Sequence, residues 1–325
     1  MSVKIIGTGS FVPEKVLTNH DLEKMVDTSH EWILERTGIH ERRIASSDEK
    51  NSDMAIAAAL RALENAGCDK NDIDLLIIAT VTPDMFFPST ACVVQEKMGM
   101  KNAVALDVSA ACSGFVYAFD IANQYLMSGR FKRALLIGSE KMSFLTDWSD
   151  RNTCILFGDG AGAVVVEYDE KRKNLINTEI GSGLDAVEYL KVPAGGSAKP
   201  IQQPQDINNE KFIKMDGKEV YKKAVNMMCV LCERILENSN KTAQDLKLVI
   251  PHQANIRIID SMRKKLKLPT EKVFVNIHRY GNSSAASIPV ALDEAFQEGL
   301  IHDGDLILLV GFGAGFTWGS VLLEW

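Results

Sequence analysis

Cys112 is the side chain whose local sequence best suits a nucleophile. It lies within residues 107–126, where small residues end a predicted strand and apolar residues at helical spacing begin at Phe115. This pattern places Cys112 and Ser113 at a helix N-terminus, where unpaired N–H groups and partial positive charge favour a thiolate and stabilise an oxyanion. A buried cysteine in a tight turn has the same pattern, so a catalytic role requires partners elsewhere in the chain.

Two further polar residues occupy similar junctions. His252 follows Pro251 at the carboxyl end of a strand predicted over residues 245–251, and Asn282 opens another predicted helix. Ligands of open α/β sheets bind at the carboxyl ends of the strands. A thiol, an imidazole and a neutral amide donor together suit acyl transfer, so we expect Cys112, His252 and Asn282 to share one site.

The elements that position these residues occur twice. A long helix followed by a buried strand is predicted over residues 51–80 and again over residues 219–251. The helices that start at Cys112 and Asn282 are each followed by another apolar strand. The number of residues between each element and its second occurrence is nearly constant. This spacing indicates an internal repeat in which Asn282 is the counterpart of Cys112.

Near-continuous apolar strands that alternate with helices predict sheets covered on both faces. We therefore predict an α/β fold of two pseudo-symmetric βαβ-rich halves, residues 1–170 and 171–325. A charged run at residues 168–174 would link the halves, and residues 193–209, with their Gly, Pro, Gln and Asn, would form a surface loop.

The composition is that of a globular protein: 325 residues, 46% of them hydrophobic, with a net charge of −7. The acidic total argues against nucleic-acid binding. Apolar runs fall short of the roughly 20 residues that cross a bilayer, so we expect no membrane span. Six cysteines without metal or disulfide spacing, and an N-terminus without a targeting pattern, predict a cytoplasmic protein that binds no metal.

Motifs along the whole chain form a specific set: Asp27-Thr28-Ser29, Arg36-Thr37-Gly38-Ile39, Ala110-Ala111-Cys112-Ser113-Gly114-Phe115, Phe157-Gly158-Asp159-Gly160-Ala161-Gly162, Pro251-His252-Gln253-Ala254-Asn255, Gly281-Asn282-Ser283-Ser284-Ala285 and Phe316-Thr317-Trp318-Gly319. The set resembles β-ketoacyl-acyl carrier protein synthase III, a thiolase-like family that initiates fatty acid synthesis. Elongating relatives would carry histidine at position 282. Degradative thiolases would carry a second cysteine near the C-terminus, whereas the last cysteine here is Cys232. The resemblance implies a layered α-β-α-β-α architecture, a homodimer and no cofactor.

The reaction that this resemblance implies has two steps. Cys112 attacks the thioester of an acetyl or short branched acyl-CoA and releases CoA. Malonyl-acyl carrier protein then loses CO2, and the resulting carbanion attacks the acyl-enzyme to give β-ketoacyl-acyl carrier protein. His252 and Asn282 would stabilise the enolate, and the backbone N–H groups of Cys112 and Ala314 would hold the oxyanion of acyl transfer.

Binding residues carry over from the same resemblance. The residues that would contact CoA and its pantetheine are Thr28, Trp32, Arg36, Arg151, Gly217 and Asn255. Trp32 and Arg151 would enclose the adenine. Phe87, which one subunit lends to its partner's acyl pocket, is expected to be buried. The acidic carrier protein would dock on Gln253, Ala254, Asn255, Ile256, Arg257, Lys222, Lys264 and Lys265. A solvated charged face is the alternative interpretation of these basic residues.

Two other functions would keep the same motifs. A related synthase of quinolone or polyketide synthesis would use another acceptor, and a non-catalytic module would bind acyl-CoA or the carrier protein without reacting. Primer length and branching depend on how Phe87 and the loop at residues 193–209 pack.

Overall fold

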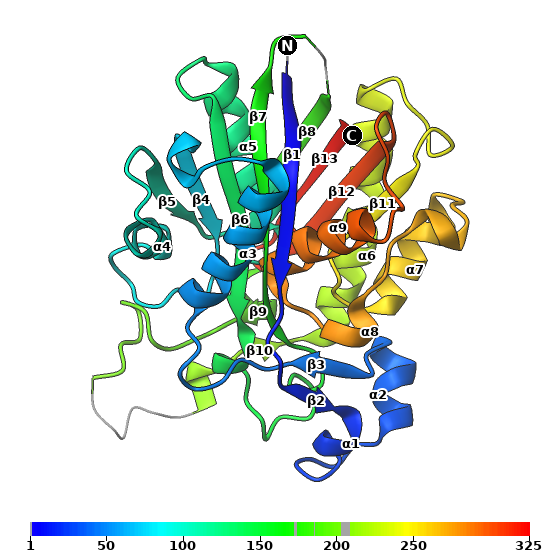
Figure 1. The fold of residues 1–325 in the computed structure, drawn as a ribbon. Helices are drawn as coiled ribbons and strands as arrows, with labels where there is room; N and C mark the ends of the chain where they lie inside the picture. The colour runs from blue at the N-terminus through cyan, green and yellow to red at the C-terminus, as the bar shows by residue number, and fades with distance from the viewer. Residues whose placement is uncertain (1, 172–173, 185, 203–208) are drawn as a thin grey trace.

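Two sheets form the framework of the computed structural model, which describes residues 2–171, 174–184, 186–202 and 209–325 (Figure 1). The first sheet contains β1 (Ser2–Phe11), β4 (Leu75–Ala79), β5 (Val104–Val108), β6 (Arg133–Lys141) and β7 (Asp159–Asp169), in the order β1-β7-β6-β4-β5. The second contains β8 (Leu175–Ser182), β11 (Leu248–Pro251), β12 (Leu306–Gly313) and β13 (Thr317–Glu324), in the order β11-β12-β13-β8. Each sheet thus draws its strands from one continuous part of the chain.

Helices form three layers around these sheets. The apolar sides of α3 (Asn51–Ala66) and α4 (Thr90–Met98) pack on the outer face of the first sheet. Those of α6 (Gly217–Asn238) and α7 (Ile256–Lys265) pack on the outer face of the second. Between the sheets lie α5 (Gly114–Met127) and α9 (Ser287–Gln297). The layered α-β-α-β-α architecture expected from the sequence is confirmed.

Strand β4 shows why the apolar runs are nearly continuous. Leu75, Ile77 and Ala79 face the central helix layer, whereas Leu76 and Ile78 face the outer one, and all five are fully buried. A side chain on either face therefore has to be apolar. Each fully buried Leu or Ile contributes roughly 1.5–3 kcal/mol, so the strands account for much of the core.

Short elements gather at one end of the sheets, at the bottom of Figure 1: α1 (Asn19–Leu22), α2 (His30–Thr37), α8 (Ile277–Tyr280), β2 (Val16–Thr18), β3 (Glu41–Arg43), β9 (Leu190–Lys191) and β10 (Lys214–Met215). The linker was predicted to start at residue 168, which is too early, because residues 168 and 169 still pair with β1. Residues 172–173 lie outside the described part of the chain. The expected loop at residues 193–209 is partly described, and residues 203–208 are not.

Two short 3₁₀ turns precede the central helices and contact each other. The first turn (Ala111–Ser113) leads into α5, and the second turn (Ser284–Ala286) leads into α9. Each begins with a non-glycine residue at positive φ, 46° at Ala111 and 49° at Ser284. The structural counterpart of Cys112 is therefore Ala285, and the expected equivalence of Cys112 with Asn282 is wrong in register. Asn282 comes just before the second turn.

Candidate active site

Cys112 lies in the middle of the first turn, with 8% of its surface exposed. The turn is held from both sides, since the Thr317 hydroxyl donates to the carbonyl of Ala110 at 2.9 Å and the Ser113 hydroxyl donates to the Thr317 oxygen at 2.8 Å. Burial raises the pKa of the Cys112 thiol to about 12. Burial thus favours the thiol over the thiolate, in the direction opposite to the effect expected of the helix start.

His252 follows β11 and is held on two sides. Its backbone N–H donates to the carbonyl of Val310 at 2.8 Å, and its Nδ1 lies 2.6 Å from the hydroxyl of Ser287. Only 3% of the residue is exposed, and burial lowers the pKa of the imidazole to about 3. The ring is thus neutral at physiological pH, and the Ser287 contact leaves Nε2 as the nitrogen available to a substrate.

Asn282 is fixed through its backbone and its side-chain oxygen. Its N–H donates to the carbonyl of Leu156 at 2.8 Å, and its carbonyl accepts from Gly158 at 3.1 Å. Its Oδ1 accepts from the N–H of Ser284 at 2.9 Å. This orientation leaves the side-chain NH2 as the group that can donate to a ligand.

The three predicted residues share one cavity. Cys112, His252 and Asn282 all line a cavity of about 560 Å³, to which Trp32, Arg36, Asn255 and Arg257 also contribute. The expectation that the three share a site therefore agrees with their placement. Thiol, neutral imidazole and primary amide face one volume that a thioester can enter.

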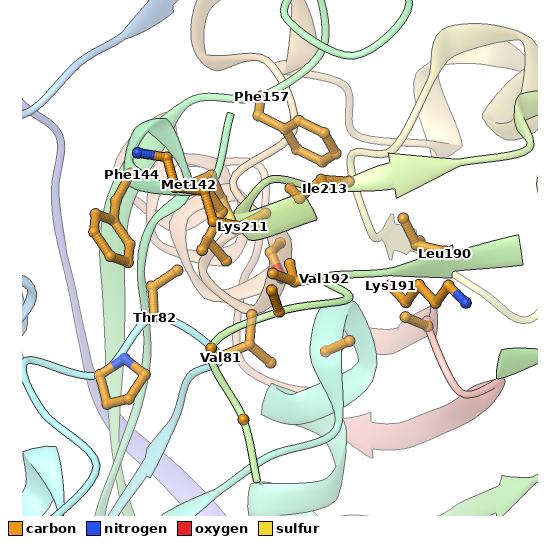
Figure 2. A pocket seen from close by; sticks show the side chains of 18 of the residues that line it. Val81, Thr82, Met142, Phe144, Phe157, Leu190, Lys191, Val192, Lys211 and Ile213 are labelled. Atoms are coloured by element: carbon orange, nitrogen blue, oxygen red, sulfur yellow. The ribbon is translucent and has the colours of Figure 1, made fainter. Parts of the chain in front are cut away.

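Cys112 also lines a second, larger cavity of about 820 Å³ whose walls are mostly apolar. Figure 2 shows Phe144 and Phe157 among its side chains, with Met142 and Ile213. Ala194, Gly195, Gly196 and Ile201 also line it, so the described part of the expected surface loop borders this cavity. An acyl chain attached to the Cys112 sulfur can thus lie among hydrocarbon side chains.

Space for an oxyanion is kept beside the Cys112 backbone. A Cβ on Gly313 would lie 2.7 Å from the nitrogen of Cys112, so only glycine leaves this N–H uncovered. Ala314 borders the apolar cavity next to Cys112. The non-glycine residues at positive φ in the described chain do not include Ala314, so alanine fits there without backbone strain.

Trp32 contacts both arginines expected near CoA. The guanidinium carbons of Arg36 and Arg151 lie 4.4 Å and 4.5 Å from the centroid of the Trp32 ring. Arg151 also pairs with Asp27 at 3.2 Å. The expected gap for an adenine between Trp32 and Arg151 is closed in this conformation, so a base can enter there only if Arg151 moves.

The other expected CoA contacts differ in their surroundings. Gly217 starts α6 and lines the smaller cavity. The Asn255 side chain caps α7 by accepting from Arg257 N–H at 2.8 Å, and it donates to the carbonyl of Arg36 at 2.9 Å. The hydroxyl oxygen of Thr28 is buried without a hydrogen-bond partner.

Phe87 is exposed in the single chain, and its expected place in the acyl pocket of a partner subunit stays a prediction. It has 85% of its surface accessible, as does Phe86, and Phe86 rather than Phe87 lines the apolar cavity. Burial of Phe87 within one chain is therefore wrong, because the loop points both rings outward.

Of the residues expected to dock a carrier protein, Gln253 is wrongly assigned. It is 1% exposed, and its side chain donates to the carbonyl of Pro251 and accepts from the N–H of Asn276. The others lie nearer the surface: Ala254, Asn255 and Ile256 are half-buried, and Arg257, Lys222, Lys264 and Lys265 are exposed. Lys265 lies 3.6 Å from Glu233.

Three polar residues close to Cys112, His252 and Asn282 were not predicted from the sequence: Ser284, Ser287 and Glu140. Ser287 contacts His252, and Ser284, which lines the apolar cavity with Cys112, donates its hydroxyl to Glu140 at 3.0 Å. Glu140 had one visible signal, since it is an acidic residue at the end of the fully buried run of β6. Ser284 and Ser287 had none, because serine is common at helix starts.

Within the described residues, no group of three or more His, Cys, Asp or Glu side chains is arranged to hold a metal ion. No helix there is long and apolar enough to cross a membrane.

Comparison with known proteins agrees with this geometry. Residues 106–183 match the family described as 3-oxoacyl-[acyl-carrier-protein] synthase III, and residues 236–325 match its C-terminal family. The β-ketoacyl-[acyl-carrier-protein] synthase III of Natranaerobius thermophilus is 52% identical over 100% of this chain and 99% of its own length.

Solved structures extend the comparison. The crystal structure of 3-oxoacyl-[acyl-carrier-protein] synthase III from Aquifex aeolicus is 49% identical, with a TM-score of 0.92 over 99% of this chain and 100% of that one. A priming β-ketosynthase of a polyketide pathway is 34% identical, with a TM-score of 0.93 over 99% and 96% of the two chains. The chain therefore belongs to the β-ketoacyl-acyl carrier protein synthase III family, the condensing acyltransferases that initiate fatty acid synthesis.

Proposed function

We propose that the chain condenses a short acyl-CoA primer with malonyl-acyl carrier protein through an acyl-Cys112 intermediate, releasing CoA, CO2 and a β-ketoacyl-carrier protein. One observation carries the proposal: Cys112, His252 and Asn282 line a single cavity, and Cys112 also opens into an apolar one. The first cavity suits the thioester arm and the second suits the acyl chain.

In the first half-reaction, the Cys112 sulfur attacks the thioester carbon and CoA leaves. The oxyanion of the tetrahedral intermediate forms beside the backbone N–H of Cys112, in the space that Gly313 keeps open. The N–H of Ala314 is the second donor. Trp32, Arg36 and Arg151 bind the nucleotide end of CoA, and Thr28, Gly217 and Asn255 flank its path.

In the second half-reaction, malonyl-carrier protein loses CO2, and its carbanion attacks the acyl-enzyme. The neutral imidazole of His252 and the NH2 of Asn282 donate to the enolate oxygen. Because burial holds the pKa of His252 at about 3, the ring acts as a neutral donor over the physiological pH range. No step requires a metal ion or cofactor.

The carrier protein approaches the face formed by α7 and the start of α6. Arg257 lines the reactive cavity and is also exposed, so the basic face is continuous with the cavity mouth. Lys222, Lys264 and Lys265 add positive charge on the surface, with Ala254, Asn255 and Ile256 beneath them. An acidic carrier is complementary to this face, and nucleic acid and membrane are not partners of the acidic chain.

A second copy of the chain covers the exposed rings of Phe86 and Phe87 beside the acyl cavity, giving a homodimer. We place this dimer in the cytoplasm. We also propose that residues 1–170 and 171–325 are the two halves of a duplication, each contributing one of the turns at the site.

Intact-mass spectrometry with a panel of acyl-CoAs tests the proposal. A stable acyl adduct that is absent from Cys112→Ala supports it, and the acyl groups that load identify the primer. Absence of an adduct with every acyl-CoA would instead favour a non-catalytic binding module. Malonyl-carrier protein should then convert the adduct to a β-ketoacyl product; an adduct that persists would point to another acceptor, as in polyketide or quinolone synthesis.

A further inference from the structure

Ser287 is the side chain that holds the imidazole of His252. It is the first residue of α9, directly after the second turn, and it is 2% exposed. Its hydroxyl oxygen lies 2.6 Å from His252 Nδ1. The backbone N–H of Gln253 donates to the same oxygen at 3.3 Å. The hydroxyl is therefore shared between the ring of His252 and the backbone that follows it.

The two bonds at this hydroxyl determine where its hydrogen lies. A backbone N–H can only donate, so the Ser287 oxygen accepts from Gln253. If His252 Nδ1 also donated to this oxygen, the hydroxyl hydrogen would have no acceptor, because these are the two hydrogen bonds that the described residues give the group. A buried donor without a partner is costly. The hydroxyl therefore donates to Nδ1, and Nδ1 carries no hydrogen.

A ring that carries no hydrogen on Nδ1 is neutral and carries its hydrogen on Nε2. The surroundings of His252 also disfavour a charged ring. His252 is 3% exposed, and the ion pairs described for histidines involve His20 and His302. A charged ring buried without an acidic partner is unfavourable. Since His252 lines the reactive cavity, the Nε2 hydrogen is the one available to a substrate.

The same short segment orients the second donor of the site. The backbone N–H of Ser284 donates to Asn282 Oδ1 at 2.9 Å, which leaves the side-chain NH2 for a ligand. The segment is packed directly against β6, because a Cβ on Gly138 would lie 2.2 Å from the carbonyl oxygen of Ala285. Residues 284–287 thus leave a hydrogen-bond donor, and not an acceptor, on both His252 and Asn282.

We propose that Ser287 is a positioning residue that keeps His252 in its Nε2–H form, so that the ring donates to the enolate oxygen; this rests on the proposed condensation. In the other tautomer, Nε2 would direct a lone pair at the negatively charged oxygen and destabilise the enolate. The proposed acylation of Cys112 does not use this hydrogen. Loss of the Ser287 hydroxyl should therefore affect the second half-reaction and spare the first.

Nitrogen-15 NMR of the full chain, labelled at histidine, reads the tautomer directly, and His252→Gln assigns the signals. At neutral pH, the wild type should show a protonated Nε2 and an unprotonated Nδ1 at His252. Ser287→Ala should show a mixture of the two tautomers, because the hydroxyl no longer selects one. A hydrogen on Nδ1 in the wild type, or an unchanged spectrum in Ser287→Ala, would overturn the proposal.

Separate single-turnover assays measure the effect on each half-reaction. Ser287→Ala should slow condensation about tenfold and change acylation less than twofold, and Ser287→Thr, which keeps a hydroxyl, should restore condensation. Ser283→Ala is the matched control, because it removes a 3% exposed hydroxyl that makes no cap hydrogen bond at the start of the second turn. Its rates should match those of the wild type.

Equal loss of both half-reactions in Ser287→Ala, or the same loss in Ser283→Ala, would show that Ser287 acts through packing and would overturn the proposal. The wild-type spectrum decides the tautomer even if Ser287→Ala does not fold. If the wild type forms no acyl adduct, the proposed function fails, whereas the spectrum still reports whether Ser287 fixes the ring.

Discussion

The two turns beside the central helices share a backbone but differ in chemistry. Ala111 and Ser284 begin them at nearly the same positive φ, and both turns lead into buried helices. Cys112 opens into two cavities, whereas its counterpart Ala285 is 1% exposed. The two turns thus share a backbone conformation, but the residue at the middle of the turn lines the cavities only in the first: Cys112 lines both, and Ala285 lines neither.

The residues proposed for the two steps of the reaction are also distributed unequally between the two parts of the chain. The first half carries the proposed nucleophile and most of the proposed CoA contacts, including Trp32 and Arg151. The second half carries the neutral donors His252 and Asn282 and the basic face for the carrier. The following experiments test whether the two halves serve separate half-reactions.

Removal of the thiol should have the largest effect. We expect Cys112→Ala to lower acylation by more than about 1,000-fold, because Cys112 is the only cysteine among the described residues that line the two cavities. Adding Ala285→Cys to this variant should not restore an adduct, since Ala285 is 1% exposed and lines neither cavity. Intact mass after incubation with acyl-CoA measures both, and an acyl group on the cysteine introduced at position 285 would show that the turns are interchangeable.

Loss of a neutral donor should affect only the second step. His252→Ala or Asn282→Ala should slow condensation by about 10²–10³-fold, because each removes a hydrogen bond to the enolate oxygen. Acylation should change by only a few-fold. Separate single-turnover assays of the two half-reactions measure this, and an equal loss in both would contradict the division between the halves.

Charge reversal on the basic face should have a moderate effect. Arg257→Glu with Lys264→Glu should raise the KM for malonyl-carrier protein about tenfold and spare acylation by acyl-CoA, because the carrier is acidic. Lys101→Glu with Lys132→Glu changes the charge equally at sites in the first half, away from this face. The same KM in both double variants would indicate that Arg257 and Lys264 lie on an ordinary solvated face.

The smallest effect is on stability, where His252 and Glu140 should act in opposite directions. The folded pKa of His252, about 3, lies below its ordinary value of 6.5, so the unfolded chain binds more protons between these values and stability falls as pH falls. The folded pKa of Glu140, about 7, lies above its ordinary value of 4.5, so stability falls as pH rises through that window.

Urea unfolding at pH 5.5 and 6.5 separates these contributions. On acidification, His252→Gln should lose less unfolding free energy than wild type, and Glu140→Gln should lose more, each by about 1 kcal/mol per pH unit. Shifts of the same sign in both variants would mean that burial does not set these two pKa values.

The layered architecture and the shared cavity could be predicted from the sequence, because both depend on local patterns. Apolar runs predicted the doubly covered strands, and residue types at strand ends predicted that Cys112, His252 and Asn282 share a cavity. The division at residue 170 stays a prediction, although the strands of the two sheets separate near it.

The features that could not be predicted from the sequence depend on packing between segments that lie far apart in the chain. Glu140 and Ser284 meet although 144 residues separate them, and no local pattern encodes that contact. Gln253 has the composition of a surface residue, yet the segment at Asn276 covers it. Phe87 is apolar, but its loop directs it away from the core of its own chain.

The position of Cys112 between two cavities has a kinetic consequence. A chain anchored on its sulfur can extend into the apolar cavity and leave the smaller cavity empty. Departing CoA and the arriving carrier arm would then use the same entrance, so only one can occupy it at a time. Free CoA should therefore compete with the second substrate, and the enzyme would slow when primer thioesters have been consumed and CoA accumulates.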